Sequence, residues 1–424
     1  METNLCVAGF GGQGVMTLGK FLADATCNST DKNVTFFPSY GAEQRGGTAN
    51  CFVVISDEAI GAPLGDVMDD LIVMNGPSLK KFIGTLKTSG TLFINSSIVS
   101  DDIGRDDVKL VKAPVTELAL EMGMDGEDPQ RIEAGLLFEL SHNLMNGHTF
   151  LPRKKLLLAT AQLIGVEAES LEDGLEALME RGEVVQEEVA GESACYLAEL
   201  QEAEEYVSAR MTEMAWQELL PPDGLEEILE QIQREQGITY APQQREAVLL
   251  AARRQVMLLT GGPGTGKTTS LRGVLALFDA LGLETALAAP TGRAAKRLGD
   301  LCGVEAATIH RLLETQFDPG TGRLVFAHDE SEPLRADAVI VDETSMVDIA
   351  LMRALLSALR SDCRLVLVGD PDQLPSVGPG NLFSDLIRSG AIPTVRLTEI
   401  FRQAAQSGIV MNAHGVNRGE LPDL

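Results

Sequence analysis

The stretch Gly261-Gly262-Pro263-Gly264-Thr265-Gly266-Lys267-Thr268 decides the fold of the C-terminal part of this 424-residue chain. It follows the apolar run Val256–Thr260 and precedes a segment with helical spacing. A glycine-rich turn between a buried strand and a helix surrounds a phosphate group with backbone N–H groups. The pattern predicts a nucleotide site that also includes Thr269, in which Lys267 reaches the β- and γ-phosphate oxygens and Thr268 coordinates Mg²⁺. The alternative is a glycine turn that binds nothing.

Three more apolar runs follow the first, and each ends at a polar motif: Thr285–Ala289, Ala338–Val341 and Leu365–Val368. This alternation of strand and helix predicts an α/β sheet, and such sheets bind ligands at the carboxyl ends of their strands. Asp342 and Glu343 stand at one of these ends. We expect Asp342 to hold Mg²⁺ through water and Glu343 to orient the attacking water, while the alternative is an acidic pair on a solvated loop.

Composition indicates a globular protein. Apolar residues make up 44% of the chain, but no apolar run reaches the roughly 20 residues that cross a bilayer, and the amino terminus does not have the pattern of an export signal. The sequence therefore predicts a cytoplasmic protein without a membrane partner. The six cysteines are scattered without a C-x-x-C pair, which argues against disulfides, a zinc site or an iron–sulfur cluster in this chain.

The net charge of −28 argues at first against a nucleic-acid-binding protein. Its distribution weakens that objection. Residues 124–236 hold 7 basic and 26 acidic side chains, whereas residues 237–424 hold 18 and 21. The near-neutral C-terminal segment can gather its basic side chains on one face, so DNA remains a possible partner.

The chain divides into three predicted domains, with residues 1–123 first. There Leu5–Ala8 is a short strand that leads through glycines into a helix, and three further apolar runs predict an α/β sheet of parallel character: Cys51–Ile55, Leu71–Met74 and Thr91–Ile94. Residues 124–236 have helical spacing at 129–144, 153–163 and 170–181, followed by a hairpin at 183–198. We expect a winged-helix-like region there, then one or two acidic helices up to 236.

Residues 237–424 carry several motifs in a fixed order: Ala289–Leu298, Thr308–Leu313, Asp342–Met346, Gly369–Pro375 and Leu397–Gln403. Together with the phosphate loop, this series resembles the RecD-type superfamily 1 DNA helicases. Residues 127–134 and 146–152 look like the helical region that precedes the motor in the longer members. The resemblance implies a P-loop NTPase motor lobe of RecA-like fold that couples ATP hydrolysis to 5′→3′ translocation on single-stranded DNA or a 5′ overhang.

The resemblance also implies roles for single residues. Gln244 would read the adenine, Gln373 would sense the γ-phosphate, and Arg402 would contact that phosphate from the second lobe. DNA would be contacted by four residues of the motor: Pro290, Thr291, Arg293 and His310. A hairpin insertion near 316–333 would be the strand-separating pin. Two alternatives stay open, an ordinary surface hairpin and a core histidine at 310.

Residues 1–123 resemble an unrelated family, the gamma subunits of 2-oxoacid:ferredoxin oxidoreductases that act on pyruvate or ketoisovalerate. The resemblance rests on Gly9-x-Gly11-Gly12-Gln13-Gly14 and on the run Phe37–Thr48. It implies that thiamine diphosphate and iron–sulfur clusters are carried by partner alpha and beta subunits. The site residues it implies are Gly11, Gly12, Gly14, Tyr40, Arg45, Gly46 and Gly47. Arg45 would meet a carboxylate or phosphate, or else form a surface salt bridge.

Each resembling segment contains only part of the domain that is typical of its family. The gamma-like part ends near Gly123, and the helicase-like part ends soon after Arg402 with only the start of a second lobe. We therefore expect this chain to bind ATP better than it hydrolyses it. Three readings remain: a helicase with an unrelated amino-terminal fusion, an oxidoreductase subunit with a non-functional helicase passenger, and an artefactual junction near Gly123-Met124.

Overall fold

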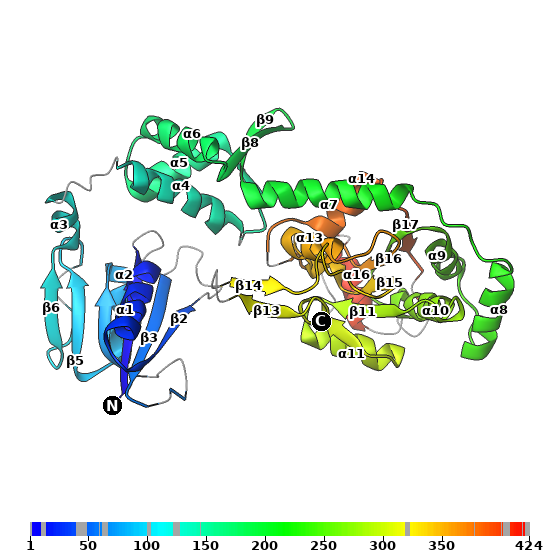
Figure 1. The fold of residues 1–424 in the computed structure, drawn as a ribbon, viewed down its shortest axis with the longest axis horizontal. Helices are drawn as coiled ribbons and strands as arrows, with labels where there is room; N and C mark the ends of the chain where they lie inside the picture. The colour runs from blue at the N-terminus through cyan, green and yellow to red at the C-terminus, as the bar shows by residue number, and fades with distance from the viewer. Residues whose placement is uncertain are drawn as a thin grey trace. The chain divides into compact units, whose positions relative to one another are not determined.

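The computed structural model describes residues 2–9, 14–39, 49–58, 60–61, 67–99, 103–121, 128–144, 146–318, 323–376, 378–399, 401, 408–417 and 419. The chain forms two compact units, residues 1–139 with 154–180 and residues 140–153 with 181–424. Each unit has its own sheet and its own buried core (Figure 1). The predicted domain boundaries at 123 and 236 differ from this division by contacts and stay predictions.

The first unit contains a mixed sheet in the order β2-β3-β1-β4-β5-β6. Its strands are β1 (Glu2–Gly9), β2 (Asn33–Ser39), β3 (Ala49–Ser56), β4 (Met68–Val73), β5 (Leu86–Asn95) and β6 (Lys109–Ala113). Strands β1, β4, β5 and β6 run parallel, but β3 is antiparallel to both β1 and β2. The helices are α1 (Val15–Ser29), α2 (Gly76–Phe82) and α3 (Val115–Glu121).

The prediction of a parallel sheet was wrong for the β2-β3-β1 part. Only residues 40–48 separate β2 from β3, and a parallel connection needs a crossover of a dozen or more residues. Strand β2, which contains Pro38, was not predicted from the sequence. Proline is tolerated in this strand because β2 lies at the edge of the sheet.

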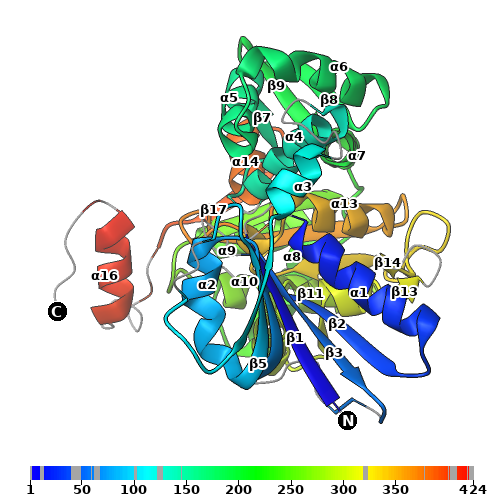
Figure 2. The ribbon, with the colours of Figure 1, turned by 90° about the vertical axis from the view of Figure 1, so that its left-hand side faces the viewer.

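Alternate residues of β1 are buried on opposite faces of this sheet. Val7 packs with Val15 of α1, and α1 lies along β2 and β3 (Figure 2). Cys6 and Ala8 pack on the other face with Phe82 of α2. Because both faces are covered, β1 reads as a continuous apolar run.

The predicted helices of the middle region are present as α4 (Pro129–Leu144), α5 (Arg153–Ile164) and α6 (Glu172–Glu180), with a 3₁₀ helix η3 (Ala168–Leu171) before α6. Helices α4 and α6 pack closely, since a Cβ on Gly174 would lie 2.4 Å from Ile132 Cγ2. The predicted hairpin is present as β8 (Val184–Val189) and β9 (Glu192–Leu197), and β7 (Phe150–Pro152) extends it to a sheet in the order β7-β9-β8. The winged-helix-like assembly of these elements stays a prediction.

The second unit contains a parallel sheet in the order β12-β11-β15-β16-β10-β17. Its strands are β10 (Val256–Gly261), β11 (Thr285–Ala289), β12 (Ala306–Thr308), β15 (Ala338–Val341), β16 (Arg364–Gly369) and β17 (Thr394–Leu397). The main helices are α7 (Ala198–Trp216), α8 (Leu225–Gln236), α9 (Pro242–Arg253), α10 (Lys267–Ala280), α11 (Gly292–Cys302), α13 (Ile349–Ser357) and α14 (Leu382–Ser389). Four of these strands were predicted, and the short β12 and β17 were not.

Helices cover both faces of this sheet. Along β10, Val256 and Leu258 pack in one core with α7, α13 and α14, whereas Met257 and Leu259 pack in another with α8, α9 and α10. All six residues of β10 are buried. The double coverage explains why the strands of this unit appear in the sequence as unbroken apolar runs.

The shorter elements of the second unit are α12 (Ile309–Leu312), the 3₁₀ helix η4 (Thr344–Met346) and α16 (Gly408–Asn417). The hairpin predicted near 316–333 is present as β13 (Thr315–Asp318) paired antiparallel with β14 (Arg323–Phe326). The acidic stretch up to 236 forms two helices, α7 and α8, as predicted.

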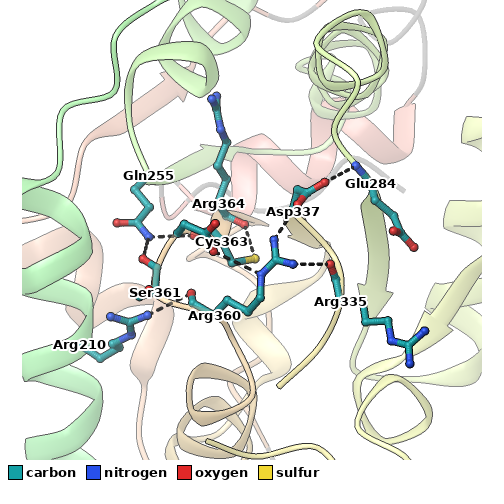
Figure 3. A network of polar contacts seen from close by, with 10 residues as sticks. Arg210, Gln255, Glu284, Arg335, Asp337, Arg360, Ser361, Cys363 and Arg364 are labelled. Carbon is teal, nitrogen blue, oxygen red and sulfur yellow. Dashed lines mark hydrogen bonds and ion pairs between the residues drawn. The ribbon is translucent and has the colours of Figure 1, made fainter. Parts of the chain in front are cut away.

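A polar network fixes the amino-terminal edge of the sheet (Figure 3). Gln255, which is 3% exposed, donates from Nε2 to the carbonyl oxygens of Ser361 at 2.6 Å and Cys363 at 3.0 Å. Arg360 pairs with Asp337 at 2.6 Å, and Asp337 accepts from the backbone of Glu284 at 2.9 Å. These bonds join the starts of β10, β11, β15 and β16, so the opposite edge of the sheet is left for a ligand.

Candidate nucleotide-binding site

The phosphate loop connects β10 to α10 at the carboxyl edge of the second unit's sheet. Gly264 and Gly266 have φ angles of 78° and 85°, a left-handed region that favours glycine. Residues 262–269 line one side of a pocket of about 1010 Å³. Because the first N–H groups of a helix have no partner within it, this turn of α10 suits an anion in the pocket.

Lys267 lies along the loop. Its Nζ donates to the carbonyl oxygens of Gly261 and Gly262, the second at 3.2 Å. Thr265 Oγ1 donates to Gly262 O at 2.8 Å, which closes the turn. The ammonium is therefore held beside the loop and within the pocket, where it supplies positive charge.

Asp342 and Glu343 follow the end of β15, and both line the same pocket. Asp342 N donates to Ala288 O of the neighbouring β11 at 3.0 Å, and Glu343 N donates to Asp342 Oδ1 at 2.9 Å. Glu343 has a φ of 54° and a ψ of 39°. A non-glycine residue in this region stores about 1–3 kcal/mol of strain, and such residues cluster at functional sites.

Burial raises the pKa of the Asp342 carboxyl, and the Glu343 N–H, Lys267 and Arg297 oppose that rise. Burial also raises the pKa of Glu343, and the nearby Asp342 charge raises it further. Glu343 Oε2 is buried and has no hydrogen-bond partner among the described residues. The charged forms of both groups therefore gain from a cation in the pocket.

These residues fit a magnesium ion. Thr268 and Asp342 both line the pocket, and hydroxyl and carboxylate oxygens are ligands that Mg²⁺ prefers. The described part of the chain contains no group of three or more His, Cys, Asp or Glu side chains that could hold a metal.

Gln373 reaches the pocket from the loop after β16. Its N–H donates to Asp370 O at 3.2 Å, and Asp370, which is 2% exposed, accepts from Asp372 N at 3.1 Å. The buried aspartate thus shapes the loop that carries Gln373. Since β16 lies between β10 and β15, this loop stands between the phosphate loop and the acidic pair.

Helix α11 forms the far wall of the pocket. Thr291 caps its amino terminus by accepting from Ala294 N at 3.2 Å. One face of the helix lines the pocket: Arg293, Ala294, Arg297, Leu298 and Leu301. The sequence analysis gave no role to Arg297, although its spacing of four residues from Arg293 places both on one helical face.

Gln244 is only 3% exposed, and its side chain bonds to protein groups. Its Oε1 accepts from Ala241 N at 3.1 Å, and its Nε2 donates to Gly266 O at 3.4 Å. Its side chain therefore contacts the phosphate loop at Gly266. The recognition of adenine by Gln244 stays a prediction. Phe401, another residue that the sequence analysis missed, lines the pocket and donates from its N–H to Gly264 O at 3.3 Å.

The predicted DNA-contacting residues follow the ends of two neighbouring strands, β11 and β12. Thr291 and Arg293 lie on the wall of the nucleotide pocket, and Pro290 precedes them at the end of β11. His310 is exposed on α12, with its ring centroid 5.7 Å from that of Phe326 in β14. The alternative of a core histidine is thus wrong, while DNA contact by these residues stays a prediction.

The remaining predicted site residues fall mostly outside the described residues. This applies to Arg402 of the motor and to six residues of the amino-terminal segment: Gly11, Gly12, Tyr40, Arg45, Gly46 and Gly47. Gly14 is described and precedes α1 with a φ of 71°. The predicted strand and helix are confirmed as β1 and α1, whereas residues 10–13 of the predicted glycine turn lie outside the described residues.

Two family models match the chain. Residues 239–423 match the AAA domain, and residues 4–191 match the pyruvate ferredoxin/flavodoxin oxidoreductase family. The second match runs past the predicted boundary at 123. No described helix is long and apolar enough to cross a membrane.

Curated relatives exist for both parts. The ATP-dependent RecD2 DNA helicase of Deinococcus radiodurans is 35% identical over 306 residues, 70% of this chain and 41% of that protein. The RecBCD enzyme subunit RecD of Mycolicibacterium smegmatis is 42% identical over 168 residues, 34% of this chain and 30% of that subunit. The ketoisovalerate oxidoreductase subunit VorA of Methanothermobacter marburgensis is 39% identical over 122 residues, 29% of this chain and 25% of that subunit.

Solved structures that match parts of the chain include an oxidoreductase gamma subunit and a helicase. The keto/oxoacid ferredoxin oxidoreductase gamma subunit of Geobacter sulfurreducens is 18% identical with a TM-score of 0.26, over 42% of this chain and 98% of that one. The Pif1 helicase of Candida albicans is 24% identical with a TM-score of 0.31, over 44% of this chain and 46% of that one. On the family and sequence matches, the C-terminal part of the chain is similar to AAA domains and RecD helicases, and the amino-terminal part is similar to pyruvate ferredoxin/flavodoxin and ketoisovalerate oxidoreductases.

Proposed function

We propose that the C-terminal part of this chain binds ATP with Mg²⁺ and acts as the motor of a DNA helicase that moves 5′→3′ on single-stranded DNA. The observation that carries the proposal is one pocket lined by the phosphate loop, Asp342, Glu343 and Gln373. The chain spans 41% of the RecD2 helicase of Deinococcus radiodurans, so the activity of that whole protein is proposed here for the shared part.

The roles follow from the positions in the pocket. Lys267 and the N–H groups of the first turn of α10 bind the phosphates. Thr268 and Asp342 hold Mg²⁺, which neutralises phosphate charge when it is bound. Glu343, with an oxygen free of protein donors, orients the water that attacks the terminal phosphate. Gln373 and Arg402 would contact that phosphate from the loops after β16 and β17.

DNA contact is proposed for Pro290, Thr291, Arg293 and His310. The hydroxyl and guanidinium groups among them suit the phosphates of a DNA backbone. The β13–β14 hairpin is the candidate for a pin that separates strands, and the His310 ring lies 5.7 Å from that of Phe326 at its base. Direction of movement rests on the similarity to the RecD-type helicases.

Replacement of Lys267 by alanine tests the nucleotide proposal. We expect wild-type chain to bind fluorescently labelled ADP and ATP analogues with Mg²⁺, and Lys267→Ala to lose at least about tenfold in affinity for each, because a charge-assisted contact is removed. Lys296→Ala is the matched control, since Lys296 is exposed on α11 and does not line the pocket. Equal binding by both variants and the wild type would contradict the proposal.

A second function is proposed for the amino-terminal part, because the oxidoreductase model matches residues 4–191. We propose that this part assembles with alpha and beta subunits that carry thiamine diphosphate and iron–sulfur clusters, and acts on a 2-oxoacid. We expect such subunits, detected by bound thiamine diphosphate, to co-purify with the tagged chain from its native source. A folded chain that recovers none of them would favour a passenger or an artefactual junction, which a peptide spanning 121–128 in native extracts decides.

A further inference from the structure

Helix α11 carries three basic residues, and two of them line the nucleotide pocket. Arg293 and Arg297 lie four residues apart on the helix face that lines the nucleotide pocket. Lys296 lies on the same helix but does not line the pocket. The helix therefore places two guanidinium groups at the pocket, and the ammonium of Lys296 does not line it.

The order of the strands places Arg297 at the terminal-phosphate end of the pocket. The phosphate loop follows β10, and Gln244 and Phe401 adjoin that loop at Gly266. The acidic pair follows β15, two strands away from β10, and α11 follows the next strand, β11. A phosphate chain that starts at the loop and extends along the pocket therefore approaches α11 with its last phosphate.

Arg297 is near the acidic pair without being bound by it. Its positive charge acts on both Asp342 and Glu343 and opposes the rise of their pKa values. Yet no hydrogen bond or ion pair joins its guanidinium to another residue in the described part of the chain, unlike Arg360 or Arg364 elsewhere in this unit. Arg297 is exposed, but it lines the pocket, and an unpaired guanidinium there matches the bidentate geometry of phosphate oxygens.

We propose that Arg297 is a specificity-determining residue that binds the terminal phosphate of a nucleoside triphosphate and so makes the pocket prefer triphosphate over diphosphate. The inference rests on the proposed nucleotide function. A diphosphate held by the loop and Lys267 ends before α11 and gains nothing from Arg297. The preference for the triphosphate is thus set by a residue of the first lobe itself.

The test measures the ratio of two affinities in the full chain. Labelled ADP is displaced either by unlabelled ADP or by the hydrolysis-resistant analogue AMP-PNP, with Mg²⁺ present. We expect Arg297→Ala and Arg297→Gln to weaken AMP-PNP binding by about 10- to 100-fold and ADP binding by less than about threefold, as one charged hydrogen bond would give. Arg297→Lys should recover part of the loss, because a single ammonium replaces a two-pronged donor.

Lys296→Ala is the control, because it removes one positive charge from the adjacent position of the same helix. It should leave the AMP-PNP to ADP ratio at the wild-type value. The inference is overturned if Arg297→Gln lowers both affinities equally, or if it changes only affinity for single-stranded DNA. ADP binding retained by the variant shows that the site has folded. A wild-type chain that binds neither nucleotide would instead refute the proposed function, and the inference with it.

Discussion

At the scale of single residues, burial and charge oppose each other around the Asp342–Glu343 pair. Burial raises the pKa of both carboxyl groups, while Lys267 and Arg297 favour their charged forms. The backbone of Glu343 is held in a left-handed conformation beside them. Backbone strain and buried charge both destabilise the fold, and they cluster at functional sites. Their coincidence here indicates a ligand site.

Burial also controls the cysteines. It raises the pKa of Cys363 to about 12 and that of Cys302 to about 11, whereas Cys27 is exposed. At pH 8 a thiol with a pKa near 11 is ionised in roughly one molecule in a thousand, and the thiolate is the reactive form. We expect Ellman's reagent to modify Cys27 first at pH 8, and the modification of Cys302 to accelerate as the pH rises toward its pKa.

The matched variant for this prediction is Cys27→Ser, which should remove the fast phase and leave the slow ones. Unfolding in denaturant should expose all six thiols. A fast phase that survives in Cys27→Ser would show that another thiol is more accessible than the structure places it.

At the scale of elements, the packing of α14 on β16 depends on a glycine. A Cβ on Gly369, at the end of β16, would lie 2.8 Å from Phe383 Cε1 and 3.0 Å from its Cζ, and Phe383 is 1% exposed. We expect Gly369→Ala to lower the free energy of unfolding by about 1–3 kcal/mol, as overpacking does in cores. Urea denaturation measures the effect.

Gly292→Ala is the control for this substitution. No atom lies within 4 Å of the Cβ position at Gly292, and it stands at the start of α11, where alanine is well tolerated. Its unfolding midpoint should equal or slightly exceed that of the wild type. If Gly369→Ala matched it, Phe383 would have to be freer to move than its burial indicates.

Elements were predictable where the sequence pattern was long and both faces of a sheet were covered. Strands β10, β11, β15 and β16 are apolar runs that end at polar motifs, and all four were found. Strand β12 has only three residues, and β17 is interrupted by the exposed Arg396, so neither forms an unbroken apolar run. Strand β2 was missed because its proline disfavours a strand except at a sheet edge, which the sequence does not reveal.

At the scale of the whole molecule, the chain consists of two units with separate cores and matches to two unrelated families. The negative charge that argues against nucleic-acid binding is concentrated in residues 124–236, which hold 7 basic and 26 acidic side chains. Residues 237–424 have nearly balanced charge and can gather their basic side chains on one face. The chain spans 41% of the RecD2 relative and 25% of the VorA relative.

The phosphate loop and the acidic pair could be predicted from the sequence alone, because each stands directly after a buried strand. Gln373 was predicted through the resemblance to RecD-type helicases. Tertiary structure was needed to bring Arg297 and Phe401 into the same pocket, since they come from elements whose distance along the chain says nothing about the order of strands in the sheet. It also decided the antiparallel placement of β3 and the burial of Gln244. Local pattern therefore predicted which residues could bind a nucleotide, and the pairing of distant strands determined which side chains lie together in one pocket.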